Sequence, residues 1–244
     1  MTDDDPRHDE LAANLEKVRG DIDGACRAAG RTDSVDLVVV TKFHTFDDLV
    51  RLLELGVRDI GENRVQEAAQ KHNDLVSNRP DLAEQARWHM VGQIQSKKAG
   101  NVASWADVVH SVDRERIADG LSRGRVRALD AQEVTVELDV LLQLSLDGDT
   151  SRGGVPEADL MPLAEYVAGL EGLRLAGLMV VPPLDTDPGE GFTRAEGIRR
   201  RLLTDYPEAK TFSAGMSADL VDAVAAGSTC VRVGAAILGP RPIP

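Results

Sequence analysis

Strand-like and helix-like segments alternate eight times along this chain, and this repetition constrains the fold more than any other feature. Amphipathic helical patterns fill the gaps between the strand candidates, and a further one, with apolar residues spaced by three and four, precedes them at 9–29. Repeated βα units of this size predict parallel strands joined by helical crossovers. The strand candidates are residues 35–41, 58–60, 88–91, 107–111, 135–144, 173–179, 210–213 and 230–233.

Chain length selects among the folds that such units build. Eight βα units in 244 residues predict an α/β protein with a closed (β/α)8 TIM-type barrel and an extra N-terminal helix, since such barrels take about 250 residues. An open, doubly wound sheet is the alternative. No linker rich in Pro, Gly or Ser divides the chain. We therefore expect residues 1–244 to form a single barrel domain, with residues 1–8 as a disordered tail.

Composition restricts the partners and the compartment. The net charge of −13 argues against binding to nucleic acid or to a membrane surface. No apolar run approaches the roughly 18–20 residues that cross a bilayer, and the acidic N-terminus has no signal-peptide pattern. Cys26 and Cys230 form neither a disulfide framework nor a metal-ligand spacing. These features predict a cytoplasmic protein, and the negative charge favours a soluble monomer.

Polar residues and glycines gather where the predicted strands end, which is the functional rim of a (β/α)8 barrel. Lys42 follows the first strand, and a partly desolvated amine at this rim can form a Schiff base with a carbonyl compound. Strand alternation places Lys42 on the face of Val38 and Val40, and Arg232 on the face of Cys230. Both Lys42 and Arg232 are therefore expected to point into the barrel mouth.

The loops after the last two strands predict a phosphate site. In SAGMSADL, Ser217 is placed to cap the next helix while its amide faces an anion. In RVGAAILG, Gly234 permits close approach of the backbone to a ligand. A Schiff-base lysine across the mouth from a phosphate site predicts pyridoxal 5'-phosphate (PLP) as the cofactor. Arg232 near its ring nitrogen would disfavour protonation there and weaken carbanion stabilisation.

Five motifs occur in order along the chain: VVVTKF around Lys42, GENRVQEA from Gly61, WHMVGQIQSKK from Trp88, GLM from Gly177, and FSAGMSADLVDAVAAGSTCVRVGAAILG from Phe212. Together they resemble the pyridoxal phosphate homeostasis proteins, a family similar to the barrel domain of bacterial alanine racemase. The resemblance implies that Lys42 holds PLP as an internal aldimine and that Arg232 faces the pyridine nitrogen. It also implies that the phosphate is held by Ser217, Gly234 and neighbouring amides, and that the pocket is lined by Asn63, His89, Met179 and Ser213.

The same resemblance implies a PLP-binding protein that contributes to vitamin B6 homeostasis without robust catalysis, with PLP-dependent apoenzymes as candidate partners. Racemisation needs two bases on opposite faces of the α-carbon. In alanine racemase the second base is a tyrosine from a β-rich domain, which we do not expect in a chain that stops at Pro244. Tyr166 and Tyr206 fall in predicted helices away from the mouth.

Three alternatives remain open from the sequence. The first is an amino acid racemase of low activity. The second is an aldolase-like barrel in which Lys42 bonds to substrate without a cofactor. The third is a metal site built from His44, His89 and His110, which the absence of spacings such as HxH or HExxH disfavours.

Overall fold

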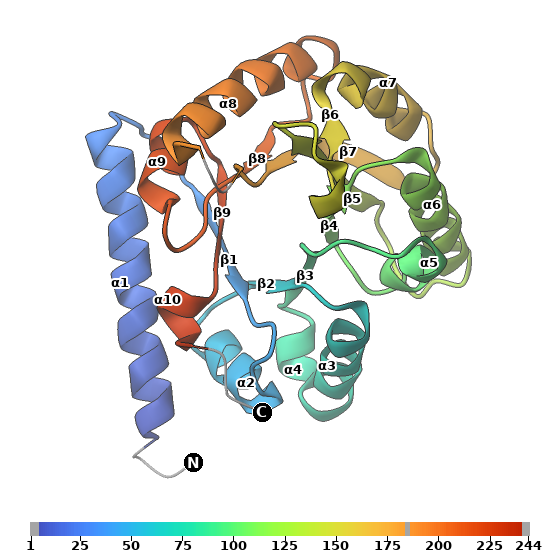
Figure 1. Cartoon of the computed structure of the whole chain (residues 1–244). Coiled ribbons are helices and arrows are strands. Elements are labelled where there is room, and N and C mark those ends of the chain that lie inside the picture. Colours follow the sequence, from blue (N-terminus) through green and yellow to red (C-terminus); the bar gives the residue numbers. More distant parts are fainter. Residues whose placement is uncertain (1–4, 184–185, 241–244) are drawn as a thin grey trace.

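Eight parallel strands close into a barrel in the computed structural model, which describes residues 5–183 and 186–240 (Figure 1). Strand β1 pairs with both β2 and β9, and a ladder between β4 and β5 completes the ring. This closure confirms the predicted barrel and excludes the open doubly wound sheet. The barrel strands are β1 (Asp36–Val40), β2 (Asp59–Glu62), β3 (Arg87–Met90), β4 (Val108–Val112), β5 (Leu138–Ser145), β7 (Leu173–Val180), β8 (Thr211–Ser213) and β9 (Cys230–Val233).

One short strand and three short helical pieces were not anticipated by the apolar patterns. Strand β6 (Val155–Pro156) pairs with the last residues of β5, beyond the end of β4. Helix α4 (Pro80–Ala83), the 3-10 turn η2 (Thr150–Arg152) and helix α10 (Ala235–Leu238) are single turns. Segments this short bury too few residues to produce a visible period in the sequence.

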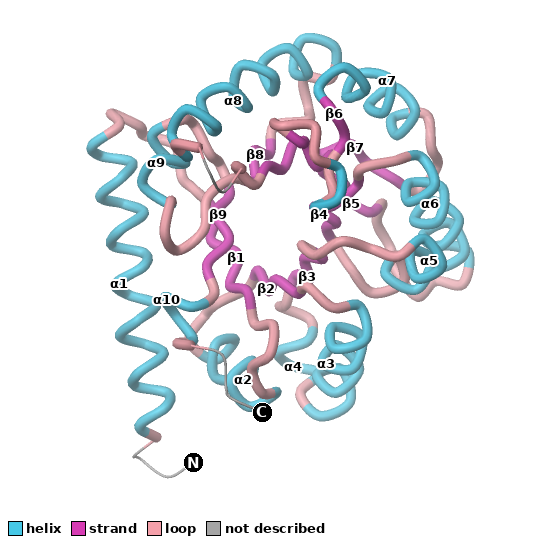
Figure 2. Tube along the Cα trace, viewed as in Figure 1, coloured by secondary structure: helices cyan, strands magenta, loops and turns pink. Residues whose placement is uncertain are grey.

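The helices that the sequence patterns predict form a layer around the outside of the barrel (Figure 2). Their amphipathic faces bury leucine, isoleucine, valine and alanine against the outer side of the strands, which makes the main core. Following the N-terminal helix, these are α2 (Phe46–Glu54), α3 (Val65–Asn78), η1 (Ser96–Lys98) with α5 (Ala99–Val102), α6 (Glu115–Asp130), α7 (Glu157–Ala168), α8 (Pro188–Asp205) and α9 (Leu220–Ala225).

The N-terminal helix α1 (Pro6–Ala28) lies along the outside of the barrel against α9, α10 and α2 (Figure 1). Asp5 caps it by accepting hydrogen bonds from the amides of Arg7 and His8, at 3.1 and 3.2 Å. The sequence predicts a disordered tail over residues 1–8, but residues 6–8 form the first turn of α1 because Asp5 stabilises it. Residues 1–4 lie outside the described part of the chain.

The inside of the barrel is more polar than the branched apolar filling usual for this fold. The parallel ladders place Val38 opposite Arg232 and Gly61 opposite His89, so these residues share the inner face. A Cβ on Gly61 would lie 2.9 Å from Val38 Cγ1, which leaves no room for a larger residue. The apolar part of the interior is a small cluster of Val108, Leu141, Ala176 and Met179.

Two features are absent from residues 5–183 and 186–240. No helix in these ranges is long and apolar enough to cross a bilayer. No group of three or more His, Cys, Asp or Glu side chains in them is arranged to hold a metal ion.

Candidate cofactor site

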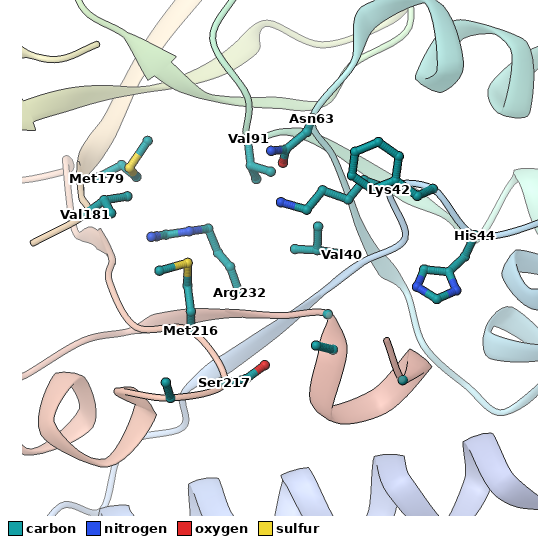
Figure 3. A pocket seen from close by; sticks show the side chains of 15 residues that line it. Val40, Lys42, His44, Asn63, Val91, Met179, Val181, Met216, Ser217 and Arg232 are labelled. Atoms are coloured by element: carbon teal, nitrogen blue, oxygen red, sulfur yellow. The ribbon is translucent and has the colours of Figure 1, made fainter. Parts of the chain in front are cut away.

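A cavity of about 410 Å³ lies at the carboxyl ends of the strands, in the mouth of the barrel (Figure 3). Its volume falls in the range of small-molecule sites, about 300–1,000 Å³. Six of the eight predicted site residues line it: Lys42, Asn63, Met179, Ser217, Arg232 and Gly234. The barrel therefore brings these six residues to one place, and their contact with a cofactor stays a prediction.

Two cationic side chains give this cavity its charge. Lys42 and Arg232 both extend into it, toward the side where Met179 and Val181 lie (Figure 3). None of the lining residues in the described part of the chain is acidic, although the whole chain carries a net charge of −13. The cavity is therefore suited to an anionic ligand.

Two hydrogen bonds hold the Arg232 guanidinium in place. Its NH1 donates to Ser213 Oγ at 2.6 Å, and its NH2 donates to the carbonyl oxygen of Val180 at 3.0 Å. Burial lowers the pKa of Arg232, but a guanidinium remains protonated in proteins. The side chain therefore offers a fixed positive charge and further N–H donors to the cavity.

His89 and Ser213 do not line the cavity, which corrects the prediction for these two residues. Both are buried inside the barrel, and each is hydrogen bonded to His110: His89 Nδ1 lies 2.9 Å from His110 Nε2, and His110 Nδ1 lies 2.9 Å from Ser213 Oγ. Their positions at the ends of predicted strands gave the correct region of the barrel for both. These positions did not give their depth, because both residues lie one layer below the rim.

His44 does line the cavity, but its ring lies apart from Lys42 and Arg232 (Figure 3). Its Nδ1 is 3.8 Å from Asp48 Oδ2, and burial lowers the pKa of the imidazole. Since His89 and His110 lie in the barrel interior, the three histidines weighed as metal ligands do not share one rim.

The loops after β8 and β9 present backbone amides at the cavity. The N–H groups of Ser217, Ala218, Gly234 and Ala235 donate to no acceptor within the described ranges, and all four residues line the cavity. Unpaired amides of this kind are typical of anion sites.

Ser217 is not the helix cap that the sequence predicts. Helix α9 begins at Leu220 with Asp219 as its N-cap residue, and Ser217 lies in the turn before it. Asp219 Oδ1 instead accepts a hydrogen bond from the Met216 amide at 2.6 Å, which closes the turn. The side chain of Ser217 is thus not engaged as a helix cap.

Comparison with known proteins agrees with this geometry. Residues 9–242 match the family described as alanine racemase, N-terminal domain. A pyridoxal phosphate homeostasis protein of Corynebacterium glutamicum is 49% identical over 86% of this chain and 92% of its own. A second, from Mycobacterium tuberculosis, is 44% identical over 96% of this chain and 94% of its own. The chain belongs to the pyridoxal phosphate homeostasis protein family.

Solved structures similar to this family member support the same barrel. PipY of Synechococcus elongatus, solved with PLP bound, is 31% identical with a TM-score of 0.77, covering 94% of this chain and all of that one. Alanine racemase of Corynebacterium glutamicum is 16% identical with a TM-score of 0.63, covering 97% of this chain and 62% of that one. The second likeness is evidence of the fold alone.

This family member also holds the backbone around Lys42 with residues that the sequence reasoning missed. Lys71 Nζ donates to the carbonyl oxygen of Thr41 at 2.8 Å, and the amide of Phe43 donates to Glu67 Oε1 at 2.6 Å. Lys71 also bonds to Glu62 Oε1 at 2.8 Å and to Glu67 Oε1 at 3.0 Å. The peptide groups on both sides of Lys42 are therefore fixed from α3. The i, i+4 spacing of Glu67 and Lys71 could have predicted their ion pair from the sequence, because residues four apart are neighbours on a helix.

The held segment has an unusual backbone. Phe43 adopts φ 69°, in the left-handed region that a bulky residue seldom occupies. The Arg64 guanidinium lies 4.6 Å from the centre of the Phe43 ring. The hydrogen bond to Glu67 and this cation–π contact compensate the strained conformation, and the turn directs the chain away from the barrel immediately after Lys42.

Proposed function

We propose that this protein binds PLP in the cavity between Lys42 and Arg232 and serves PLP homeostasis rather than substrate turnover. The observation that carries the proposal is the convergence of the Lys42 amine, Arg232 and the unpaired amides of two loops on one cavity without acidic residues in the described ranges. The names of the curated relatives, and the PLP bound to PipY, support the same ligand.

Each part of the cavity fits a part of this cofactor. Lys42 supplies the primary amine that would bond to the aldehyde carbon. The amides of Ser217, Ala218, Gly234 and Ala235 would hold the phosphate, and Asn63 and Met179 would line the ring. When bound, PLP supplies an electron sink whose strength depends on the protonation of its ring nitrogen. Arg232 would face that nitrogen as a hydrogen-bond donor with no proton to release, so the sink stays weak.

The absence of robust catalysis is part of the proposal, and the positions of the tyrosines support it. Tyr166 donates a hydrogen bond to Asp119 at 2.6 Å, on the outer helices, and Tyr206 follows the end of α8. None of the residues that line the cavity in the described ranges is a tyrosine. A tyrosine that could serve as the second base opposite Lys42 is thus lacking among them, and two bases are needed for racemisation. His44 lines the cavity, but its ring lies apart from Lys42 (Figure 3).

We also propose that the protein acts as a cytoplasmic monomer that transfers PLP to PLP-dependent apoenzymes. The rim of the cavity supports exchange of the ligand, since Val181 and Met216 are 38% and 41% exposed. The net charge of −13 supports a soluble monomer, and the free thiols of Cys26 and Cys230 suit a reducing compartment.

The test is titration of the purified protein with PLP, followed by borohydride reduction and peptide mass spectrometry. We expect a visible absorbance band and an adduct on Lys42 in the wild type and in Lys97→Ala, whose lysine is exposed. We expect neither in Lys42→Ala. An adduct on a different lysine would contradict the proposal. Deuterium incorporation at the α-carbon of alanine, lost in Lys42→Ala, would instead favour the racemase alternative.

A further inference from the structure

A continuous line of hydrogen-bonded side chains crosses the inside of the barrel and ends at Arg232. Asp59 Oδ1 lies 2.8 Å from His89 Nε2, His89 bonds to His110 at 2.9 Å, and His110 bonds to Ser213 at 2.9 Å. Ser213 then receives the hydrogen bond from Arg232 at 2.6 Å. Strands β2, β3, β4, β8 and β9 each contribute one member. We name this set the interior relay.

The interior relay occupies space that branched apolar residues fill in most barrels of this class. Its four members from His89 to Arg232 are at most 6% exposed. Buried polar groups destabilise a fold unless every one is paired, and none of the relay atoms is among the buried unpaired atoms of the described chain. Apolar side chains would fill the same space without the free-energy cost of burying polar groups. The fully hydrogen-bonded relay therefore indicates a role for Arg232, the residue at its end.

The Asp59 end of the relay sets the direction of every hydrogen bond in it. An ionised Asp59 can only accept, so His89 carries a proton on Nε2 and donates to it. A neutral His89 then accepts at Nδ1, so His110 carries its proton on Nε2 and donates to His89. The Nδ1 of a neutral His110 in turn accepts from the hydroxyl of Ser213, whose oxygen also accepts from Arg232. Reversal of the line would require a doubly protonated His89.

The electrostatics agree with an ionised Asp59 and a neutral His110. Burial raises the pKa of Asp59, but the hydrogen bond from His89 and the nearby positive charge of Arg87 oppose it, and the pKa lies below its usual value. Burial holds the pKa of His110 well below its usual value, and the charge of Arg232 lowers it further. Asp59 is thus an ionised acceptor, and His110 a neutral link.

We propose that Ser213, His110, His89 and Asp59 are positioning residues for Arg232, with both histidines neutral and protonated on Nε2. The relay holds NH1, the carbonyl of Val180 holds NH2, and the guanidinium is presented to the ring nitrogen of PLP in one orientation. The ligand side of this inference rests on the proposed function. The tautomers and the direction of the line do not, because they follow from the protein alone.

The first test uses the protein without PLP. Long-range 1H–15N spectra of histidine-labelled protein report which ring nitrogen carries the proton. We expect the Nε2–H form for both His89 and His110 at neutral pH. An Nδ1–H form of either ring, or an imidazolium at His89, would overturn the inference even if PLP binds to Lys42. The predicted tautomers without PLP binding would instead refute the proposed function and leave the relay intact.

The second test asks whether the relay acts on Arg232 or only stabilises the barrel. Ser213→Ala should weaken PLP binding by about tenfold to a hundredfold, the range for loss of a hydrogen bond to a charged group, and shift the absorbance of bound PLP. Ser213→Thr, which keeps the hydroxyl, should restore both. Ser228→Ala is the matched control, since Ser228 is also buried and its hydroxyl, within the described chain, bonds only to backbone carbonyls around β8 and β9, including that of Phe212.

The Ser228→Ala control separates an effect on the stability of the barrel from an effect on bound PLP. We expect Ser228→Ala to lower the melting temperature while leaving the spectrum and the affinity for PLP unchanged. Equal effects of Ser213→Ala and Ser228→Ala on the spectrum of bound PLP, or no spectral change in Ser213→Ala, would show that the relay is structural and would overturn the proposal.

Discussion

The Nζ atom of Lys71 lies 2.8 Å from the carbonyl oxygen of Thr41, the residue immediately before Lys42. This contact connects α3 to the end of β1. The same ammonium group balances the buried carboxylate of Glu62, which lies just before Asn63 of the cavity. The position of Lys42 in the barrel mouth therefore depends on charges that lie outside the cavity.

Replacement of Lys71 tests this dependence. Lys71→Met should reduce the free energy of unfolding by about 3–5 kcal/mol, because it leaves the Glu62 carboxylate buried without its counter-charge. The measurement is urea unfolding followed by circular dichroism. Lys97→Met is the control, since Lys97 is exposed, and should change the free energy by at most about 0.5 kcal/mol. Similar results for both variants would contradict the inferred role of Lys71.

Gly234 tests the loop that follows β9. A Cβ at this position would lie 3.0 Å from the carbonyl oxygen of Val40, so Gly234→Ala must shift the loop that carries the Gly234 and Ala235 amides. We expect the affinity for PLP to fall about tenfold, or 1.4 kcal/mol, in a fluorescence titration.

The glycine control is Gly197, in the middle of α8, where a Cβ would meet nothing within 4 Å. Gly197→Ala should stabilise the fold by up to about 1 kcal/mol and leave PLP affinity unchanged. Unchanged affinity in Gly234→Ala would show that the β9 loop does not contact the ligand closely.

Asn14 tests the connection between α1 and the cavity. Its Nδ2 donates to the carbonyl oxygen of Ile237 at 2.9 Å, in the single-turn helix α10 that starts beside Gly234. Asn14→Ala should lower the free energy of unfolding by about 1 kcal/mol, the typical contribution of one hydrogen bond, and weaken PLP binding with it. The exposed Lys17 of the same helix provides the control variant Lys17→Ala. A loss of stability without loss of affinity would separate α1 from the site.

His110 predicts a specific dependence of stability on pH. Burial keeps its pKa in the folded protein well below the usual 6.5, so only the unfolded chain takes up the proton as the pH falls below 6.5. Its contribution to stability is therefore complete above pH 6.5 and decreases below it, with a limiting slope of about 1.4 kcal/mol per pH unit.

The measurement is the free energy of unfolding across this pH range in the wild type and in His110→Gln. Burial lowers the pKa values of His44 and His72 as well, so both proteins should lose stability in acid. The wild type should have the steeper slope, by one proton. Parallel curves would contradict a neutral, buried His110.

Much of the architecture was predictable because it follows from local pattern. All eight barrel strands have counterparts among the predicted segments, since a strand buried on both faces is a short apolar run bounded by polar residues. Five of the six cavity residues were predictable from strand ends and the loops that follow them, because parallel strands deliver their carboxyl ends to one rim, whereas Met179 came from the family resemblance. Residues 6–8 and Ser217 were assigned wrongly, since Asp5 and Asp219 provide the hydrogen bonds that decide those two turns.

The sequence by itself determined the eight βα units, the inward direction of Lys42 and Arg232, and the family, because periodicity and motif order are local to the chain. Closure of the barrel was predicted from chain length and settled by the ladder between β4 and β5. Only the tertiary structure decided which side chains support Lys42 and Arg232. Lys71 reaches Thr41 across 30 positions of sequence, and His110 reaches Ser213 across 103. Such pairings depend on barrel closure and on the depth of each side chain within it, and the period of a strand specifies only a face.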